Sequence, residues 1–350
     1  MTQRTWAGLL AVPLLLALWA IALTSPLPYV TYEPGLTVDV LGAADGKEII
    51  QVDGRKTYRD DGELRLTTVY VTRPESDVNL LQLMQGWISN DDAVYPVRAV
   101  YPPGETDAAS QKQGAIEMVS SQDAAVAVAL TELGIKYDDA TKVLTVDPKA
   151  PAGDVLKPGD LIRAVNDEPV TTPSQVEKAV LASGPGKPLE LRIERAGAER
   201  TVTLTPEEKD GKARVGIEML PSYRFPFQVT VGIDEQIGGP SAGLMFSLGI
   251  YDTLTPGSMT NGDVIAGTGT IAPSGKVGPI GGIQQKIAAA RETGAELFLV
   301  PSGNCREALG ATNGDMRLVR ASTMHDAVDA LETWTEDPDA DLPSCEEEAS

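Results

Sequence analysis

The chain has 350 residues, enough for two or three domains that each bury a core of their own. Its formal net charge of −21 argues against nucleic acid and against an anionic membrane surface as partners. The two cysteines, Cys305 and Cys345, lack metal-ligand spacing and the chain has a single histidine, so we expect no metal site and no cofactor.

An uncharged run near the N-terminus predicts a membrane segment. Residues 6–23 are mostly Leu, Ala, Val and Trp, and a run of this length just suffices to span a bilayer. Arg4 precedes the run, and Glu33 is the first charged residue after it. The positive-inside rule therefore leaves residues 1–5 in the cytoplasm and the rest of the chain outside.

A cleaved signal peptide is the alternative, because Ala20-Ile21-Ala22 has the small-x-small form of a cleavage site. The apolar run passes this site without a polar region, which favours an uncleaved anchor. Both interpretations place the body of the protein outside the cytoplasm, and we expect a single-pass protein of the cell membrane. In that compartment a Cys305–Cys345 disulfide is permitted, and two free thiols are the alternative.

Residues 36–115 read as a mixed α/β region in which we find no chemistry. Asp53-Gly54 and Asp60-Asp61-Gly62 are hairpin signals between two β-leaning runs. A helix start at Ser76-Asp77 precedes apolar residues at helical spacing, and an Ala-rich helix follows. The expected elements are strands at 49–52 and 64–71, a helix carrying Leu80, Leu81, Met84 and Trp87, and a helix over 113–133.

Short strands around one helix follow. Thr172-Pro173-Ser174-Gln175 is a capping box with Pro at the first helical position, and Gly184-Pro185-Gly186 ends that helix. The strings Leu156-x-x-Gly159-Asp160-x-Ile162 and Asn166-x-x-Pro169-Val170 resemble a PDZ domain. That resemblance implies binding of peptide ends by strand addition. Leu133-Gly134-Ile135 is either its carboxylate loop or a helix C-cap at Gly134. The expected strands are 143–146, 161–165, 190–194 and 201–204.

A turn rich in small residues, Gly238-Gly239-Pro240-Ser241-Ala242-Gly243, places Ser241 between a strand-like run and a helix-like run. The first helical N–H groups favour developing negative charge, so this is a suitable place for a nucleophile. The stretch also fits the Gly-x-Ser-x-Gly pattern of hydrolases. The alternative is a tight turn in which Ser241 only caps the helix.

A second stretch, from Val277 to Ala290, reads as a turn that enters a helix ending at Gly294. Lys286 falls on the apolar stripe of this helix with Ile283 and Ile287. Burial disfavours a charged amine and lowers its pKa, and a neutral amine beside a serine hydroxyl makes a Ser–Lys nucleophile pair. The alternative is a lysine that extends to solvent from the edge of the stripe.

Together these residues resemble the proteolytic domain of the Lon-type serine peptidases, over residues 229–300 and more loosely to Trp334. The resemblance implies Ser241 as nucleophile, Lys286 as general base and Thr268 as an active-site hydrogen-bonding residue. One position departs from the family, which usually has an acidic residue where this chain has Gly238. No P-loop is present, so no ATPase module is visible in this sequence.

We therefore expect an α+β protein with an N-terminal transmembrane helix, a PDZ-like β-rich domain and a Lon-type α/β proteolytic domain. Its partners would be protein or peptide substrates, and the sequence leaves a homo-oligomer open. The expected segments are 1–5 (cytoplasmic), 6–23 (anchor), 36–115 (mixed α/β), 116–207 (PDZ-like), 225–335 (proteolytic) and 336–350 (an acidic disordered tail).

Two other functions remain to be weighed. An α/β-hydrolase would need a histidine, and His325 lies in the first turn of an expected helix, off its apolar stripe. The doubly wound pattern of that fold is also missing. A non-catalytic PDZ scaffold is the second alternative, and the presence of both Ser241 and Lys286 argues against it. The favoured function is an ATP-independent serine endopeptidase acting on extracytoplasmic or membrane-associated proteins.

Overall fold

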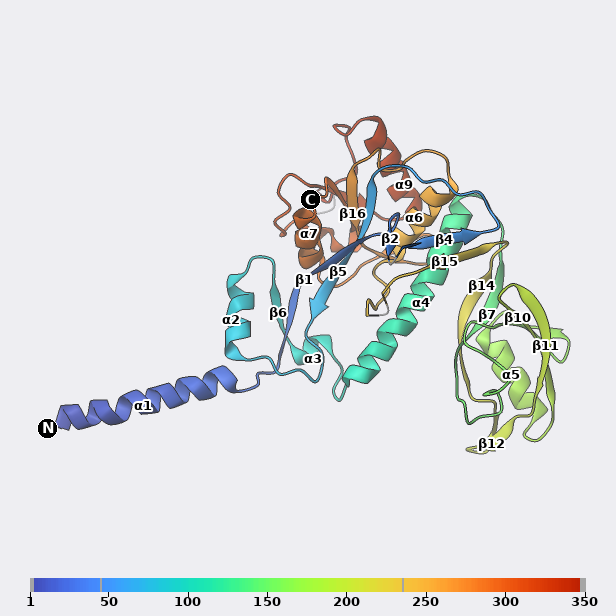
Figure 1. The fold of residues 1–350 in the computed structure, drawn as a ribbon, viewed down its shortest axis with the longest axis horizontal. Coiled ribbons are helices and arrows are strands. Elements are labelled where there is room, and N and C mark those ends of the chain that lie inside the picture. Colours follow the sequence, from blue (N-terminus) through green and yellow to red (C-terminus); the bar gives the residue numbers. More distant parts are fainter. Residues whose placement is uncertain (1–2, 45, 235, 347–350) are drawn as a thin grey trace.

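A six-stranded mixed sheet forms the centre of the larger body in the computed structural model, which describes residues 3–44, 46–234 and 236–346 (Figure 1). Its strand order is β20-β19-β16-β5-β1-β6. The pairs β5–β16, β16–β19 and β19–β20 are parallel, whereas β1 is antiparallel to both of its neighbours. The strands are β1 (Tyr29–Asp39), β5 (Glu63–Val71), β6 (Ala93–Pro96), β16 (Val264–Gly267), β19 (Leu297–Pro301) and β20 (Arg317–Ala321).

Helices cover both faces of this sheet. Side chains alternate along each buried strand, so one strand supplies residues to the cores on both faces. Leu297 and Leu299 of β19 join the core under α4 (Asp107–Glu132), α6 (Gly243–Leu254) and α9 (Met324–Glu336). Phe298 and Val300 point the other way, into the core under α7 (Ile283–Glu292) and the short α8 (Cys305–Ala308). The turn that carries Ser241 and the helix α7, which carries Lys286, therefore approach the sheet from opposite faces.

The mixed region expected at 36–115 is part of this body and not a separate unit, since β1, β5 and β6 are strands of the central sheet. The strands expected at 49–52 and 64–71 do not pair with each other as a hairpin. Instead β4 (Ile50–Asp53) pairs with β15 (Gln228–Val231), and β5 pairs with β1 and β16. The remaining elements are α2 (Leu80–Ile88, capped by Asn79), α3 (Val97–Val100), the 3₁₀ turn Ser302–Asn304, and the strand pairs β2 (Ala43–Ala44) with β3 (Lys47–Glu48) and β17 (Thr270–Ile271) with β18 (Val277–Gly278).

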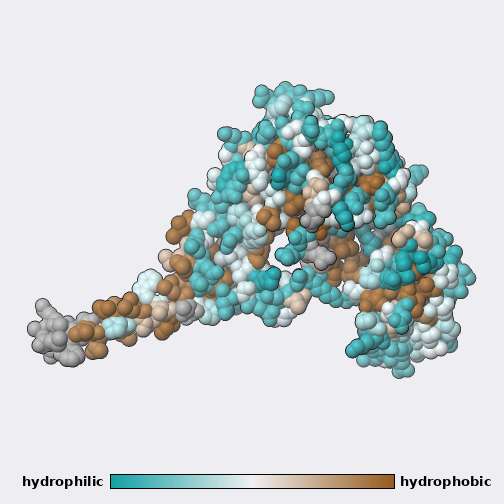
Figure 2. All heavy atoms as spheres, viewed as in Figure 1, coloured by the Kyte–Doolittle hydropathy of each residue, from teal (hydrophilic) through white to brown (hydrophobic). Residues whose placement is uncertain are grey.

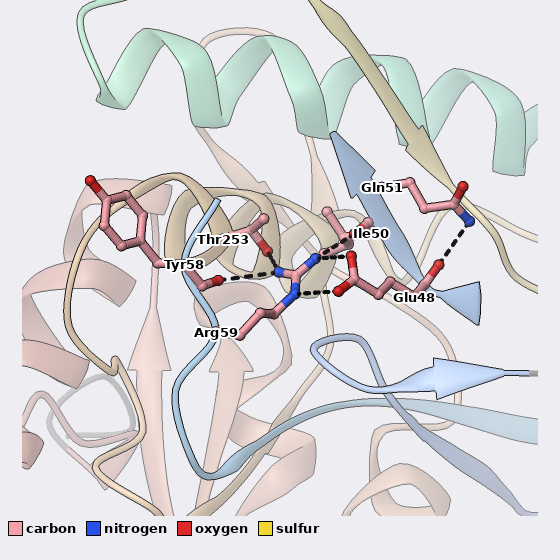
Figure 3. A network of polar contacts seen from close by, with 6 residues as sticks. All are labelled: Glu48, Ile50, Gln51, Tyr58, Arg59 and Thr253. Carbon is pink, nitrogen blue, oxygen red and sulfur yellow. Dashed lines mark hydrogen bonds and ion pairs between the residues drawn. The ribbon is translucent and has the colours of Figure 1, made fainter. Parts of the chain in front are cut away.

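Arg59 fastens the segment between β4 and β5 to the end of α6 (Figure 3). Its guanidinium donates to the Glu48 carboxylate at 2.7 Å, to the Ile50 carbonyl at 2.7 Å and to the Thr253 hydroxyl at 2.6 Å. Bidentate pairing with a carboxylate fixes the guanidinium in one orientation. The C-terminal end of α6 is thereby held in place, and Ser241 lies just before the N-terminal end of the same helix.

A second sheet, in the order β11-β10-β8-β7-β14, forms the smaller body (Figure 1). The helix α5 (Pro173–Ser183) packs on it, and the capping box predicted at Thr172 and Gln175 is confirmed. Its core is separate from the two cores of the larger body. The strands are β7 (Asp138–Val146), β8 (Leu161–Val165) with β9 (Glu168–Pro169) beside it, β10 (Leu189–Arg195), β11 (Ala198–Leu204) and β14 (Ile217–Arg224), and β12 (Glu207–Lys209) pairs with β13 (Lys212–Arg214).

The boundaries expected for this smaller domain, 116–207, need correction at both ends. At the N-terminal end α4 packs in the core of the larger body, where Ala125 and Leu130 are fully buried. At the C-terminal end β14 pairs along its whole length with β7. The Leu133-Gly134-Ile135 stretch is the end of α4, because the N–H of Gly134 bonds to Thr131 and that of Ile135 to Leu130. Gly134 has a φ of +67°, a conformation that glycine commonly adopts just after the end of a helix.

The acidic segment after α9 is ordered as far as residue 346, which corrects the expected disordered tail; residues 347–350 lie outside the described part. Cys345 forms a disulfide with Cys305, and Leu342 is buried. The backbone of Arg320 donates to Pro343 at 2.8 Å. A covalent link and apolar burial fix a segment whose composition alone predicts disorder.

The N-terminal helix α1 (Gln3–Thr24) projects away from the larger body (Figure 1). Its described side chains are apolar and exposed, for example Leu10 at 69% and Trp19 at 57% (Figure 2). The predicted segments 1–5 and 6–23 lie partly outside the description, which lacks residues 1–2 and the side chains of residues 3–8. Among the helices as described, none is long and apolar enough to cross a membrane.

Candidate active site

Ser241 lies in the last residues of a loop that runs from β15 to α6. The helix begins at Gly243 with Ala242 at its N-cap, so Ser241 is placed next to a helix N-terminus as the sequence predicts. A side chain at position 243 would lie 2.7 Å from Ile271 and 2.9 Å from the Ser121 hydroxyl. Glycine at 243 is therefore required for the helix to pack this closely behind Ser241.

Lys286 reaches Ser241 from the other face of the sheet. It lies in the middle of α7, with Ile283 and Ile287 beside it in the core, and is only 2% exposed. Its Nζ atom is 3.0 Å from the Ser241 Oγ atom. The predicted burial of this lysine is confirmed, and the alternative of a side chain that extends to solvent is wrong.

Three oxygens of the described residues surround the Lys286 amine. Besides Ser241, they are the Thr67 carbonyl at 2.6 Å and the Thr268 hydroxyl at 3.1 Å. The Thr268 hydroxyl itself donates to the Ser241 carbonyl at 3.0 Å, so toward the amine it acts as acceptor. A neutral amine has two N–H donors, and Thr67 and Thr268 take both. Its lone pair then faces Ser241, as a general base requires.

Burial lowers the pKa of the Lys286 amine from its ordinary value of 10.5 to about 7. Desolvation disfavours the charged form, and all three oxygens bonded to Nζ in the described structure belong to uncharged groups. A large fraction of the amine is consequently neutral near pH 7. It can take the proton of Ser241 without first losing one to solvent.

The Ser241 loop is held from behind by α4. Gly239 donates its N–H to the Gly114 carbonyl at 2.9 Å, and the Ser121 hydroxyl donates to the Pro240 carbonyl at 3.0 Å. A Cβ atom added at Gly238 would lie 3.3 Å from the backbone of Gly114. A Cβ atom at 238, where the resemblance to the Lon family predicts an acidic residue, would therefore be in tight contact with α4.

His325 lies elsewhere, at the exposed start of α9. Its ring nitrogens face Glu132 at 2.7 Å and Asp329 at 3.5 Å, and its side chain is 67% exposed. These carboxylates raise the pKa of the imidazole. The residue takes no part in the cluster around Ser241, which removes the support for a Ser–His–acid triad.

Sequence reasoning missed the residues that reach the site from far away in the chain. The sequence predicts Thr67 on a strand, in a region where it indicates no chemistry, and it predicts Gly114 and Ser121 on an Ala-rich helix. A backbone carbonyl such as that of Thr67 leaves no signature in the sequence. For Gly114, a glycine inside a helical pattern was the available signal, because glycine there usually has a packing reason.

The Lon protease (S16) C-terminal proteolytic domain matches residues 235–331, which include Ser241, Thr268 and Lys286, and a PDZ domain matches residues 131–205. The chain combines a PDZ domain with a Lon-type proteolytic domain of the serine-peptidase class. Both predicted resemblances are thereby confirmed.

Individual relatives match over short stretches. Lon protease 2 of Bacillus subtilis is 33% identical over 95 residues, which cover 27% of this chain and 17% of that protein. The zinc metalloprotease RasP of Geobacillus kaustophilus is 46% identical over 54 residues, which cover 15% of this chain and 13% of that protein. The chain therefore spans less than a fifth of the length of either relative.

Among the described residues, no cluster of three or more His, Cys, Asp or Glu side chains could hold a metal ion.

Among solved structures, the PDZ domain of an SdrC-like protein from Listeria monocytogenes is 20% identical with a TM-score of 0.23. The matched region covers 25% of this chain and 92% of that structure.

Proposed function

We propose that this protein is a serine endopeptidase that hydrolyses peptide bonds with a Ser241–Lys286 dyad and needs no ATP. The observation that carries the proposal is the 3.0 Å contact between the Lys286 amine and the Ser241 hydroxyl, made by a lysine that is 2% exposed. Thr67 and Thr268 accept hydrogen bonds from the same amine, which in its neutral form leaves the lone pair for the Ser241 hydroxyl. The sequence contains no P-loop, which supports independence from ATP.

The reaction follows from this geometry. Ser241 Oγ attacks the carbonyl carbon of the substrate while Lys286 Nζ takes the hydroxyl proton. The N–H groups of Gly243 and Leu244, the first of α6, bond to the carbonyls of Pro240 and Gly269, so other backbone N–H groups around Ser241 would stabilise the developing oxyanion. Lys286 then gives its proton to the leaving amine as the peptide C–N bond breaks. Water hydrolyses the acyl-enzyme by the same steps and restores the Ser241 hydroxyl.

The PDZ domain would engage protein substrates. PDZ domains bind peptides by adding a strand to the edge of their sheet, and β14 is an edge strand that contacts α5. Peptide capture at this edge would hold a flexible segment close to the proteolytic domain. A raised local concentration then favours cleavage of that segment.

We further propose that α1 anchors the protein in the cell membrane with the catalytic body outside the cytoplasm. The apolar, exposed side chains of α1 support this, as does Arg4 on its N-terminal side (Figure 2). Exposed Trp87 and Ile88 on α2, close to α1, add apolar surface on the same side. Protease added outside intact cells should digest the body and leave a tag before Arg4 protected; digestion only after lysis would contradict the proposal.

The activity is tested with purified protein and an unstructured polypeptide, without nucleotide and with a chelator present. The parent should cleave it, and a folded Ser241→Ala variant should not. Cleavage by the Ser241→Ala protein at the parent's rate would rule out the dyad. A requirement for ATP in the parent would remove the second part of the proposal and leave the dyad intact.

A further inference from the structure

The helix α2 presents an apolar stripe to solvent. Large apolar side chains recur along it at intervals of three and four residues, which places them on one side of the helix: Leu81, Met84, Trp87 and Ile88. All four are exposed, Trp87 at 61% and Ile88 at 78%. A contiguous row of exposed apolar side chains of this size marks a surface that contacts another molecule or a lipid phase.

A different side of α2 is packed against the central sheet. Leu83 and Gly86 are buried, and the helix contacts β1 and β6. A Cβ atom at Gly86 would lie 2.8 Å from a methyl carbon of Val94 in β6, so the helix backbone approaches the strand closely. The capping box of Asn79 and Gln82 fixes the start of the helix. Packing and capping therefore hold the apolar stripe outward in a fixed orientation.

The stripe continues the apolar surface of α1. The two helices are in contact, and Figure 1 shows α2 beside the end of α1 that joins the body. The backbone N–H of Leu27, three residues after α1 ends at Thr24, donates to the carbonyl of Val78 at 2.8 Å, just before α2. Figure 2 shows hydrophobic atoms along α1 and on the part of the body next to it. The surroundings of α1 are therefore within reach of α2 as well.

Charge distinguishes between the surfaces that α2 could contact. The helix contains no charged residue, and the chain has a formal net charge of −21. Ion pairing with anionic headgroups needs clustered lysines or arginines, which α2 lacks. Burial of apolar side chains at the boundary between headgroups and acyl chains needs no charge. Tryptophan is enriched at that depth, which suits the exposed Trp87. The apolar part of a lipid bilayer fits this surface best.

We propose that α2 lies in the membrane interface, with Leu81, Met84, Trp87 and Ile88 inserted among the lipid acyl chains beside α1. The inference rests on the proposed anchoring by α1. It adds a second contact with the lipid, made by the larger body itself. Two contacts fix the orientation of the catalytic body on the membrane, which one helix alone would leave free.

The test uses the full-length protein in vesicles of phosphatidylcholine, part of which carries a spin label on its acyl chain. A polarity-sensitive fluorescent group is attached to one engineered cysteine at a time, because the native cysteines are held in their disulfide. Ile88→Cys reports on α2 and Leu16→Cys on α1, both at exposed positions. Leu181→Cys is the matched control at an exposed leucine of α5. The groups at 88 and 16 should lose most of their fluorescence, and the group at 181 should keep it.

The outcomes separate α2 from the anchor. Quenching at 16 with a water-exposed, unquenched group at 88 overturns the contact of α2 and leaves the anchor standing. Emission from 88 that shifts to the blue without quenching also overturns it, because a second copy of the chain or another protein would then cover the stripe. A group at 16 that the lipid does not quench contradicts the anchoring and this inference with it. Met84→Cys is a second reporter on the stripe and must be quenched as Ile88→Cys is.

Discussion

The backbones of Gly114 in α4 and Gly239 in the nucleophile loop are joined by a hydrogen bond of 2.9 Å from the Gly239 N–H to the Gly114 carbonyl. The same helix carries Lys112 and Asp123, which pair with Glu218 and Lys142 of the PDZ domain. One helix thus holds the turn that carries Ser241 on one side and the PDZ sheet on the other.

This contact predicts the effect of Gly238→Asp, which restores the acidic residue usual in the family. The new Cβ atom would lie 3.3 Å from the Gly114 backbone, and the larger side chain would push α4 away. We expect a loss of stability of about 1–3 kcal/mol and a fall in kcat, because Ser241 moves from Lys286. Gly232→Ala is the control, since its nearest neighbour would be 3.7 Å away. Wild-type kcat in a folded Gly238→Asp protein would contradict the role given to α4.

Thr268 should act by orienting Lys286. Thr268→Val keeps the shape but removes the hydroxyl that joins the Lys286 amine to the Ser241 carbonyl. We expect kcat to fall about tenfold to a hundredfold. The acidic limb of the pH profile should move to lower pH, since the ammonium form loses an acceptor. Thr268→Ser should restore both properties. An unshifted limb in Thr268→Val would show that the hydroxyl does not contact the base.

Much of this site was visible in the sequence, because each main residue lies in a short contiguous pattern. Ser241 stands among small residues before a helix, and Lys286 stands on an apolar stripe. Thr67, Gly114 and Ser121 could not be found in this way, since only tertiary packing brings a β5 carbonyl and two α4 residues to the same place.

The fold was predicted best where local patterns decide it. The PDZ helix begins at its capping box as expected. The pairing of β4 with β15 was missed, because two turn signals next to each other favoured a local hairpin over a partner more than a hundred residues away. The order of the C-terminal segment was not predicted, because its acidic composition is typical of disorder and does not reveal that the Cys345 disulfide fixes it.

Burial of Lys286 should make the protein less stable at neutral than at alkaline pH. Its pKa is about 7 in the folded chain and near 10.5 when unfolded, so the unfolded chain binds the additional proton between these values. Stability should therefore rise with pH across this window, by roughly 1.4 kcal/mol per unit. Lys286→Met should lack this contribution. Denaturant unfolding at pH 7 and pH 10 measures it, and equal pH slopes in the two proteins would mean that the lysine is not desolvated.

The disulfide should contribute substantially to stability. Cys305 and Cys345 are buried and close a loop with a sequence separation of 40. Cross-linking a loop of this length is worth about 4 kcal/mol in the chain-entropy account. The double variant Cys305→Ser/Cys345→Ser should lose an amount of this order in denaturant unfolding. Parent protein that unfolds at the same denaturant concentration with and without reductant would contradict this expectation.

The most direct test of the Ser–Lys dyad is the pH dependence of kcat/KM on one unstructured peptide, for the parent and for His325→Ala. We expect an acidic limb with a pKa of about 7 in both proteins, because the limb reports Lys286 and not the exposed imidazole. A limb that disappears or activity that is lost in folded His325→Ala, or a parent limb near the ordinary lysine value of about 10.4, would contradict the neutral-lysine mechanism.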